Sequence, residues 1–262
     1  MARWNPQDYA QNSTGQERWA KELIAQLDLK HDDTVLDIGC GDGRHTAVIA
    51  SLVPQGSVLG TDFSPEMIAH AQREHMSAPL PNLSFEVADA AALPYPARFS
   101  VIFSNAAIHW VPGEHASVLR GIANALLPHG HALLQLGGHG NGAGIIAAFD
   151  TVRSRPEWAA HFAEFRFPYG FHRVEDYQRW AQEAGLTVVD AQLIPKIMPY
   201  ADRAAFNGWL RTAWLPFIEP VPEAARADYI EAVVDAYLAA NPGDINVRMV
   251  RLQVSLRHAS HA

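Results

Sequence analysis

The segment Val35-Leu36-Asp37-Ile38-Gly39-Cys40-Gly41-Asp42-Gly43 decides the fold of this 262-residue chain. An apolar strand leads directly into three closely spaced glycines, and a helical pattern follows over 44–52. A second apolar stretch, 57–61, is followed by Asp62, which lies 25 residues after Asp37. Open α/β sheets use this order of strand, glycine turn, helix and acid-tipped second strand to hold the ribose of an adenosine-containing cofactor. The sequence therefore predicts a nucleotide-like cofactor.

The spacing of the glycines distinguishes two kinds of cofactor. A dinucleotide fingerprint is G-x-G-x-x-G, whose third glycine lets the helix pack closely against the strand. Counted from Gly39, that position is Arg44, which is too bulky for such a contact, and the extra glycine is Gly43. The pattern G-x-G-x-G, with an acid at Asp37, closely resembles the nucleotide loop of class I methyltransferases that depend on S-adenosyl-L-methionine (SAM).

The resemblance implies a role for each residue of this loop. The glycines let the backbone approach the methionine part of SAM at Gly39, Gly41 and Gly43. Asp37 is expected near the ammonium group of the cofactor, and Asp62 is expected to bond both ribose hydroxyls. Cys40 belongs to the cofactor loop as a small residue, not as a catalytic thiol.

Further cofactor contacts are expected where the third and fourth strands end. In the family, an acid at the position of Asp89 accepts the adenine amino group and the backbone of Ala90 donates to the ring, although Asp89 also fits a solvated loop. Two apolar residues beside the ribose acid, Phe63 and Met67, are candidates for an adenine wall, and Met67 fits the core equally well. Asn105, at the fourth strand end, is expected at the cofactor edge.

Composition narrows the class of protein. Hydrophobic residues make up 48% of the chain, and the formal net charge of -8 argues against nucleic acid or an anionic membrane as the main partner. The single cysteine, Cys40, cannot form an intrachain disulfide. Neither a signal core over 1–9 nor an apolar run of about 18 residues is present, so we expect a cytoplasmic location.

Strand and helix signals alternate from residue 33 to about 138. Five strands are predicted at 34–38, 57–61, 83–87, 99–104 and 131–136, with two more near 187–196 and 247–257. The pattern predicts a Rossmann-like, seven-stranded, mostly parallel α/β sheet with helices on both faces and a helical lid insertion. The expected parts are an N-terminal helical lid segment (1–30), a SAM-binding core (31–138), and substrate-cap insertions with the closing strands (139–262).

A narrower resemblance rests on four segments: Trp4-Asn5-Pro6-x-x-Tyr9, Asn12 to Gln16, Ser104 to Val111, and Leu126-Leu127-Pro128-His129-Gly130. Together they look like the trans-aconitate methyltransferase group, and 12–16 and 109–110 also resemble juvenile hormone acid methyltransferases. Both relatives esterify carboxylates, and the resemblance implies that Gln16 and Trp110 hold the acceptor carboxylate. His129 departs from the family pattern, which has glycine there.

The chemistry agrees with a small carboxylic acid as acceptor. An ionised carboxylate is already a nucleophile at neutral pH, so alignment with the methyl group replaces base catalysis. The expected products are a methyl ester and S-adenosyl-L-homocysteine. No metal is expected, because the thirteen histidines are dispersed and lack further ligands at metal spacing.

Three alternatives stay open from the sequence. His109, beside Trp110, would act as the base if the acceptor were a phenol, amine or carbon acid. A SAM-binding protein without catalysis is the second alternative, and a nicotinamide oxidoreductase, against which Arg44 counts, is the third. The oligomeric state and the identity of the acceptor are undetermined by the sequence.

Overall fold

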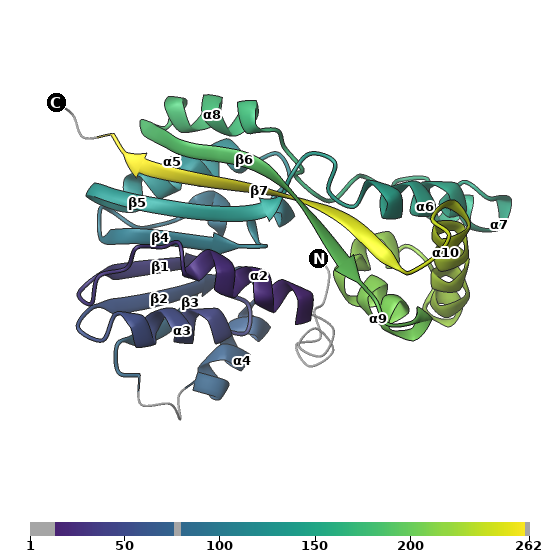
Figure 1. The fold of residues 1–262 in the computed structure, drawn as a ribbon, viewed down its shortest axis with the longest axis horizontal. Coiled ribbons are helices and arrows are strands. Elements are labelled where there is room, and N and C mark those ends of the chain that lie inside the picture. The colour runs from purple at the N-terminus through teal and green to yellow at the C-terminus, as the bar shows by residue number, and fades with distance from the viewer. Residues whose placement is uncertain (1–13, 76–79, 260–262) are drawn as a thin grey trace. The chain divides into compact units, whose positions relative to one another are not determined.

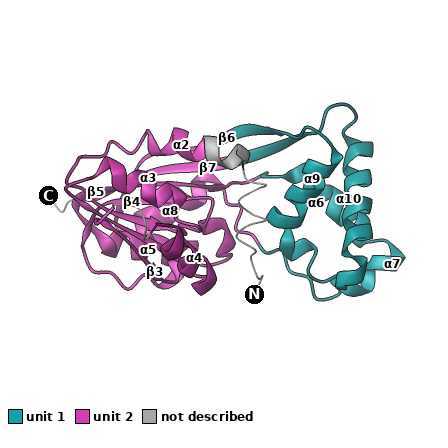
Figure 2. Ribbon diagram, turned by 90° about the horizontal axis from the view of Figure 1, so that it is seen from below, with its two compact units in different colours: residues 1–16, 140–168, 195–250 teal, residues 17–139, 169–194, 251–262 magenta. Residues whose placement is uncertain are grey.

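The computed structural model describes residues 14–75 and 80–259, and these fall into two compact units (Figures 1 and 2). Of the described residues, unit 2 contains those within 17–139, 169–194 and 251–259, and unit 1 contains 14–16, 140–168 and 195–250. The two units therefore interleave along the chain. The domain boundaries expected at residues 30 and 138 stay predictions.

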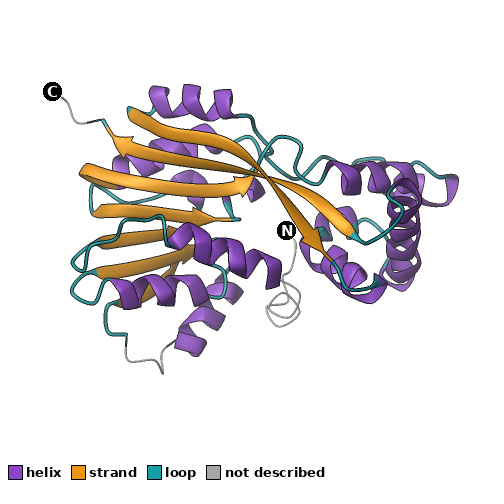
Figure 3. Cartoon of the chain, in the orientation of Figure 1, coloured by secondary structure: helices purple, strands orange, loops and turns teal. Residues whose placement is uncertain are grey.

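A sheet of seven strands runs in the order β3-β2-β1-β4-β5-β7-β6 within the described residues (Figure 3). The strands are β1 (Thr34–Ile38), β2 (Ser57–Asp62), β3 (Leu83–Val87), β4 (Phe99–Asn105), β5 (Leu126–Gly137), β6 (Leu186–Pro199) and β7 (Asn246–His258). β1 pairs in parallel with β2 and β4, β3 extends the sheet beyond β2, and β5 pairs in parallel with β4. β7 is antiparallel to β5. The predicted seven-stranded, mostly parallel α/β sheet is confirmed.

Helices of unit 2, drawn in magenta in Figure 2, cover both faces of the sheet. They are α2 (Thr14–Ile24), α3 (Arg44–Leu52), α4 (Pro65–His75), α5 (His115–Ala125) and α8 (Val174–Glu183), with short turns η1 (Ala90–Ala92) and η2 (Ile108–Trp110). Val101 is buried with residues of α2 and α3, whereas its neighbour Ile102 is buried with residues of α5 and α8. The alternation of strand side chains thus builds two separate cores.

Unit 1, drawn in teal in Figure 2, is built around aromatic rings. Its helical segments are α6 (Ala143–Arg153), α7 (Pro156–Ala159), η3 (Ala160–Phe162), α9 (Arg203–Ala213), η4 (Leu215–Phe217), η5 (Glu223–Ala225) and α10 (Arg226–Ala240). The ring centroids of Phe149 and Phe217 are 4.8 Å apart, and Phe162 stacks on Tyr229 at 5.4 Å. These aromatic side chains form the core of this unit. In the described ranges, none of the helices of either unit is long and apolar enough to cross a lipid bilayer.

Two local features differ from the sequence prediction. β5 begins at Leu126 instead of residue 131, because Leu126 already pairs with Phe99 before a register shift in β4. Helix α8 was not predicted. Its apolar stripe is short, consisting mainly of the buried Tyr177 and Ala181, and its start is held by a hydrogen bond from the Arg173 amide to the Asp176 carboxylate (3.2 Å).

Candidate cofactor and acceptor site

The glycine loop connects β1 to α3 and is tied to the end of β2. The amides of Gly39 and Cys40 both donate to the carbonyl of Thr61, at 2.7 and 2.8 Å. Gly39 has φ +75°, and a Cβ placed there would lie 2.0 Å from the Cβ of Ala107. The loop after β4 therefore touches the backbone of the glycine loop, and no larger residue fits at position 39.

The acid at the end of β2 binds the same loop. Oδ2 of Asp62 accepts from the Gly41 amide at 3.0 Å, and Oδ1 accepts from the Ser64 amide at 2.9 Å. Burial raises the pKa of Asp62, and these amide hydrogen bonds oppose the increase. Each carboxylate oxygen can accept more than one hydrogen bond. The carboxylate is therefore held in a fixed orientation and can accept further hydrogen bonds from a ligand.

Asp37 lies beneath this loop with only 2% of its surface exposed. Its Oδ2 accepts a hydrogen bond from the hydroxyl of Thr46 in α3, at 2.7 Å. Burial raises the pKa of Asp37 to about 7, the Thr46 hydrogen bond lowers it, and the charge of Asp62 raises it. A buried carboxylate that titrates near neutrality is suited to a cationic ligand, because a positive charge would stabilise its ionised form.

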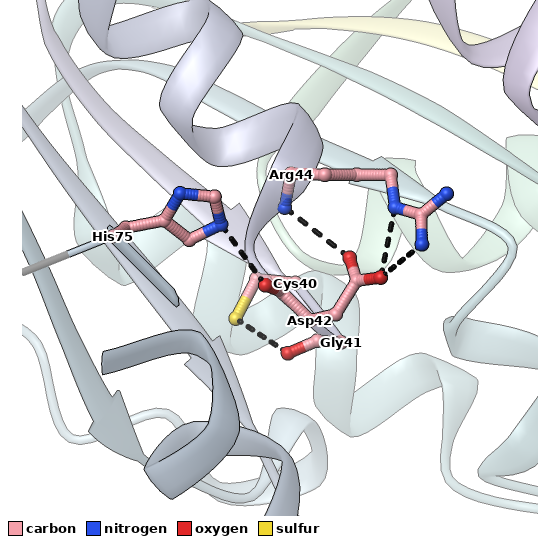
Figure 4. A network of polar contacts seen from close by, with 5 residues as sticks. All are labelled: Cys40, Gly41, Asp42, Arg44 and His75. Atoms are coloured by element: carbon pink, nitrogen blue, oxygen red, sulfur yellow. Dashed lines mark hydrogen bonds and ion pairs between the residues drawn. The ribbon is translucent and has the colours of Figure 1, made fainter. Parts of the chain in front are cut away.

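The residue that replaces the third dinucleotide glycine also has a defined place. The backbone amide and Nε of Arg44 donate to the carboxylate of Asp42, at 3.2 and 2.8 Å. From the opposite side, Nε2 of His75 lies 3.1 Å from the Asp42 carbonyl oxygen (Figure 4). Asp42 is thereby held between α3 and the last residue of α4. The guanidinium of Arg44 is thus paired with the carboxylate of Asp42. Its positive charge therefore does not indicate a phosphate-binding site.

The remaining loop residues differ in exposure. Phe63 is 54% exposed, whereas Met67 is 7% exposed and packs against the loop at Gly41, and the role of both in an adenine wall stays a prediction. The Cys40 thiol is buried, which raises its pKa. The Asp89 carboxylate accepts a hydrogen bond from the Ala91 amide (2.8 Å) at the start of η1. This bond fixes the orientation of the carboxylate next to the backbone of Ala90.

The chain after β4 makes a strained turn. Ala106 has φ +56°, which is rare for a residue with a side chain, and its amide donates to the carbonyl of Gln135 at 2.7 Å. Asn105 is half-buried immediately before it, and η2 follows with His109 and Trp110. Strain of this kind gathers at functional sites.

His109 is buried among aromatic rings. Trp110, Tyr169 and Phe171 lie with ring centroids 5.7 to 5.9 Å from its imidazole, and Tyr169 meets Trp110 edge to face at 4.8 Å. The Gly137 amide donates to Nδ1 of His109 at 3.4 Å. Burial, with smaller contributions from Arg251 and His115, holds the pKa of His109 well below its usual range. The imidazole is therefore neutral at physiological pH.

The side chain of Gln16 lies outside the described residues, as do Trp4, Asn5, Pro6, Tyr9 and Asn12. Sequence reasoning also missed three residues beside His109, namely Tyr169, Phe171 and Arg251. Tyr169 and Phe171 lie more than 30 residues beyond the last strand of the predicted cofactor core, and no local motif marks them. The only available signal was that Arg251 interrupts an apolar strand, Val250-Arg251-Leu252.

Comparison with known proteins agrees with this geometry. Residues 35–130 match the model of a methyltransferase domain. The chain is 31% identical to a trans-aconitate 2-methyltransferase of Methylobacterium radiotolerans, over 92% of each chain. It is 29% identical to a protein of the same name in Methylobacterium nodulans, over 95% of each chain.

Solved structures share the fold at lower sequence identity. The YcgJ protein of Bacillus subtilis superposes with a TM-score of 0.63 at 17% identity, covering 92% of this chain and 98% of that protein. A putative sarcosine dimethylglycine methyltransferase of Galdieria sulphuraria superposes with a TM-score of 0.60 at 14% identity, covering 96% and 88% of the two chains.

Proposed function

Because the chain belongs to the class I SAM-dependent methyltransferases, we propose that its acceptor is a carboxylate oxygen of a small organic acid, which becomes a methyl ester. The similarity to trans-aconitate 2-methyltransferases over nearly the full length of both chains carries this proposal. The lowered pKa of the buried His109 supports it, because such an imidazole is a weak proton acceptor and a carboxylate needs no base at neutral pH.

SAM, when bound, supplies a methyl group that is activated by its sulfonium. In our proposal, Asp62 holds the ribose hydroxyls, and the loop of Gly39, Gly41 and Gly43 holds the methionine part with Cys40 packed beneath. Asp37 neutralises the ammonium group. Asp89, Ala90 and Phe63 hold the adenine, Met67 supports the loop from below, and Asn105 borders the cofactor from β4.

For the acceptor, the proposal assigns alignment to neutral donors. The indole N–H of Trp110, with the amide of Gln16, would hold one carboxylate while leaving its negative charge on oxygen. A lysine or arginine on that oxygen would draw charge away and weaken it as a nucleophile. The rings of Tyr169 and Phe171 exclude water from the same segment, which strengthens such hydrogen bonds.

The test is mass spectrometry of reactions that contain the protein, SAM with an isotopically labelled methyl group, and a panel of carboxylic acids. A product that is heavier by one labelled methyl and is cleaved by base is expected. The His109→Gln variant separates this acceptor from the others, because turnover that needs no base should persist in it. Labelled product that resists base, together with loss of turnover in H109Q, would instead indicate an oxygen, nitrogen or carbon acceptor that needs a base. SAM binding without any product would indicate a protein that only binds the cofactor.

A further inference from the structure

Residues 169–172, which we call the wall segment, lie beside the segment to which we assign the acceptor. The Gly170 amide donates to the carbonyl of His109 at 2.8 Å, and the His139 amide donates to the carbonyl of His172 at 2.8 Å. The two rings on either side of Gly170 are those whose centroids lie 5.9 and 5.8 Å from the His109 imidazole. The backbone of the wall segment therefore sets where these rings stand beside His109.

His115, the first residue of α5, supports the wall segment from behind. His115 is 1% exposed, and a Cβ placed on Gly170 would lie 2.2 Å from its Nε2. The next two atoms that this Cβ would meet, both at 3.0 Å, belong to the same imidazole. Gly170 is not among the glycines with a left-handed backbone. The imidazole of His115 is therefore what excludes a side chain at residue 170.

Tyr177 of α8 holds this imidazole in place. Its hydroxyl oxygen lies 2.7 Å from Nδ1 of His115, and neither residue is more than 1% exposed. The rings of His172 and Trp180 meet the imidazole at centroid distances of 4.3 and 5.9 Å. The imidazole cannot turn away from Gly170 without breaking the hydrogen bond and displacing these neighbours. Its position is therefore fixed by the packing of α5 against α8.

Packing alone does not explain a histidine at residue 115. Within the part of the chain that the structure describes, Nε2 of His115 has no hydrogen-bond partner. A buried polar atom without a partner costs free energy, which a hydrocarbon ring of similar size would not. Burial, with a smaller effect from the charge of His172, lowers the pKa of His115 to about 3, so the ring is uncharged. A neutral ring that is anchored at Nδ1 and meets Gly170 with Nε2 is suited to fixing a position.

We propose that His115 is a positioning residue for methyl transfer: it fixes the wall segment through Gly170, and the wall segment fixes the His109-Trp110 segment on which the acceptor is aligned. Alignment is the main contribution that the protein can make when the nucleophile needs no base, and a displacement of about 1 Å can cost about 100-fold in rate. The inference rests on the proposed function, because that function places the acceptor beside Trp110.

The experiment compares the wild-type protein with H115N, with G170A and with the double variant, and uses H131N as the matched control. Asparagine keeps a hydrogen-bonding group near the place of Nδ1 of His115 but lacks the atoms that meet Gly170. His131 is a partly buried histidine of unit 2, six residues before the end of β5, and its Nε2 donates to the carbonyl of Leu27 at 2.8 Å. H131N therefore removes an imidazole and its contact without touching the wall segment.

Three measurements are made on each protein. Calorimetry gives the affinity for SAM and counts the binding sites, so that kcat refers only to folded protein. Steady-state assays with the acid that reacts best give kcat and KM. Hydrogen exchange followed by mass spectrometry reports the protection of the amides within 169–172 and 107–111, which reflects local opening.

We expect H115N to lower kcat at least about tenfold and to speed exchange in the wall segment, while KM for the acid and the affinity for SAM change less than about threefold. H131N should stay within about twofold of the wild type in all of these. A kcat of H115N that matches that of H131N would overturn the inference. Y177F removes only the anchoring hydroxyl and serves if H115N fails to fold. It should lower kcat at least about threefold, and a match with H131N would count equally against the inference.

The double variant tests whether the effect passes through Gly170. G170A alone should lower kcat as H115N does, because its methyl group meets the imidazole. It should cost little in the H115N background, where that obstacle is gone, so the two losses should be far from additive. A loss of the same size in both backgrounds would overturn the inference.

The product distinguishes the failure of this inference from that of the proposed function. A labelled product that resists base, with the same dependence on His115, would retain the positioning role and reject the ester reaction. A methyl ester that H115N and G170A form at the wild-type rate would do the reverse. If none of the acids is methylated, faster exchange of the wall segment in H115N retains the role of His115 and rejects the ester reaction, whereas unchanged exchange rejects both.

Discussion

Ala107 occupies the space that any side chain at residue 39 would need, since the Cβ of Ala107 lies 2.0 Å from a Cβ placed on Gly39. The contact joins the loop after β1 to the loop after β4. One of these loops carries the cofactor residues and the other carries the acceptor residues of our proposal. Their relative position therefore depends on the absence of a side chain at residue 39.

Gly39→Ala should lower both the stability of the protein and its affinity for SAM. The variant combines a clash with Ala107 and a left-handed backbone, so we expect it to lose at least about 2 kcal/mol of unfolding free energy. Gly113→Ala is the control, because Gly113 has φ +84° and nothing near its Cβ position. That control should lose only about 1 kcal/mol and keep its SAM affinity. Denaturant unfolding and calorimetry measure both quantities, and equal losses would refute a role for the contact.

Asp62→Asn should weaken SAM binding without a comparable loss of stability. The asparagine side chain would have one oxygen where the Asp62 carboxylate has two. Its NH₂ group would then face the backbone N–H of Gly41 or Ser64, which is also a donor. Losing one or two hydrogen bonds to the ribose should raise the dissociation constant about 10- to 100-fold. Glu74→Gln, an exposed acid of α4, removes the same charge and should bind as the wild type does. Similar affinities for the two variants, measured by calorimetry, would remove Asp62 from the site.

The stability of the cofactor-free protein should depend on pH through Asp37. The folded-state pKa is about 7, against 3.8 for the free side chain, so the folded protein holds this proton more tightly. The contribution of Asp37 is therefore fully present below its unfolded pKa and is lost as the pH rises toward about 7. Asp37→Asn removes that loss. Thermal melts at pH 8 should show the variant to be more stable by at least about 1 kcal/mol, which is about 2 to 4 °C.

SAM binding should respond to Asp37 in the opposite sense. Because the cofactor is cationic, it favours the ionised carboxylate, and the affinity of the wild type should rise between about pH 6 and pH 8. Calorimetry with Asp37→Asn should give weaker binding at pH 8 and a flatter pH profile. A wild-type profile that the variant reproduces would show that Asp37 does not face the charge of the ligand.

Replacing His129 by glycine should stabilise the protein. His129 has φ +67° in the turn of Leu127-Pro128-His129-Gly130, at the position where the family resemblance leads us to expect glycine. Relief of the left-handed strain should add up to about 1 kcal/mol, even though glycine gains entropy in the unfolded chain. His31→Gly provides the comparison at an exposed turn residue outside the left-handed region, and it should be neutral or destabilising. The midpoints of denaturant unfolding measure the difference in stability. A less stable H129G would mean that a contact of the histidine side chain stabilises the protein by more than the backbone strain destabilises it.

Much of the cofactor region was predictable because its signals are local. The strand at 34–38, the glycines, helix 44–52 and the acid at the end of the next strand lie within about thirty residues, and each follows from periodicity, turn chemistry or position. Helix α8 escaped prediction because Tyr177 and Ala181 provide too short an apolar stripe in a polar segment. The β5 boundary depended on its pairing with Phe99, a partner that the local pattern does not reveal.

The sequence by itself determined the α/β sheet, the kind of cofactor and the loop that holds it, since these depend on contacts between neighbours in the chain. Tertiary structure alone placed Tyr169, Phe171 and Arg251 around His109, because strand pairing and ring packing join residues that are 60 to more than 140 positions apart. The same burial makes His109 a neutral group. Desolvation and the charge of Arg251 act on His109 only once the chain has folded. They lower its pKa, and a lower pKa makes the imidazole a weaker base.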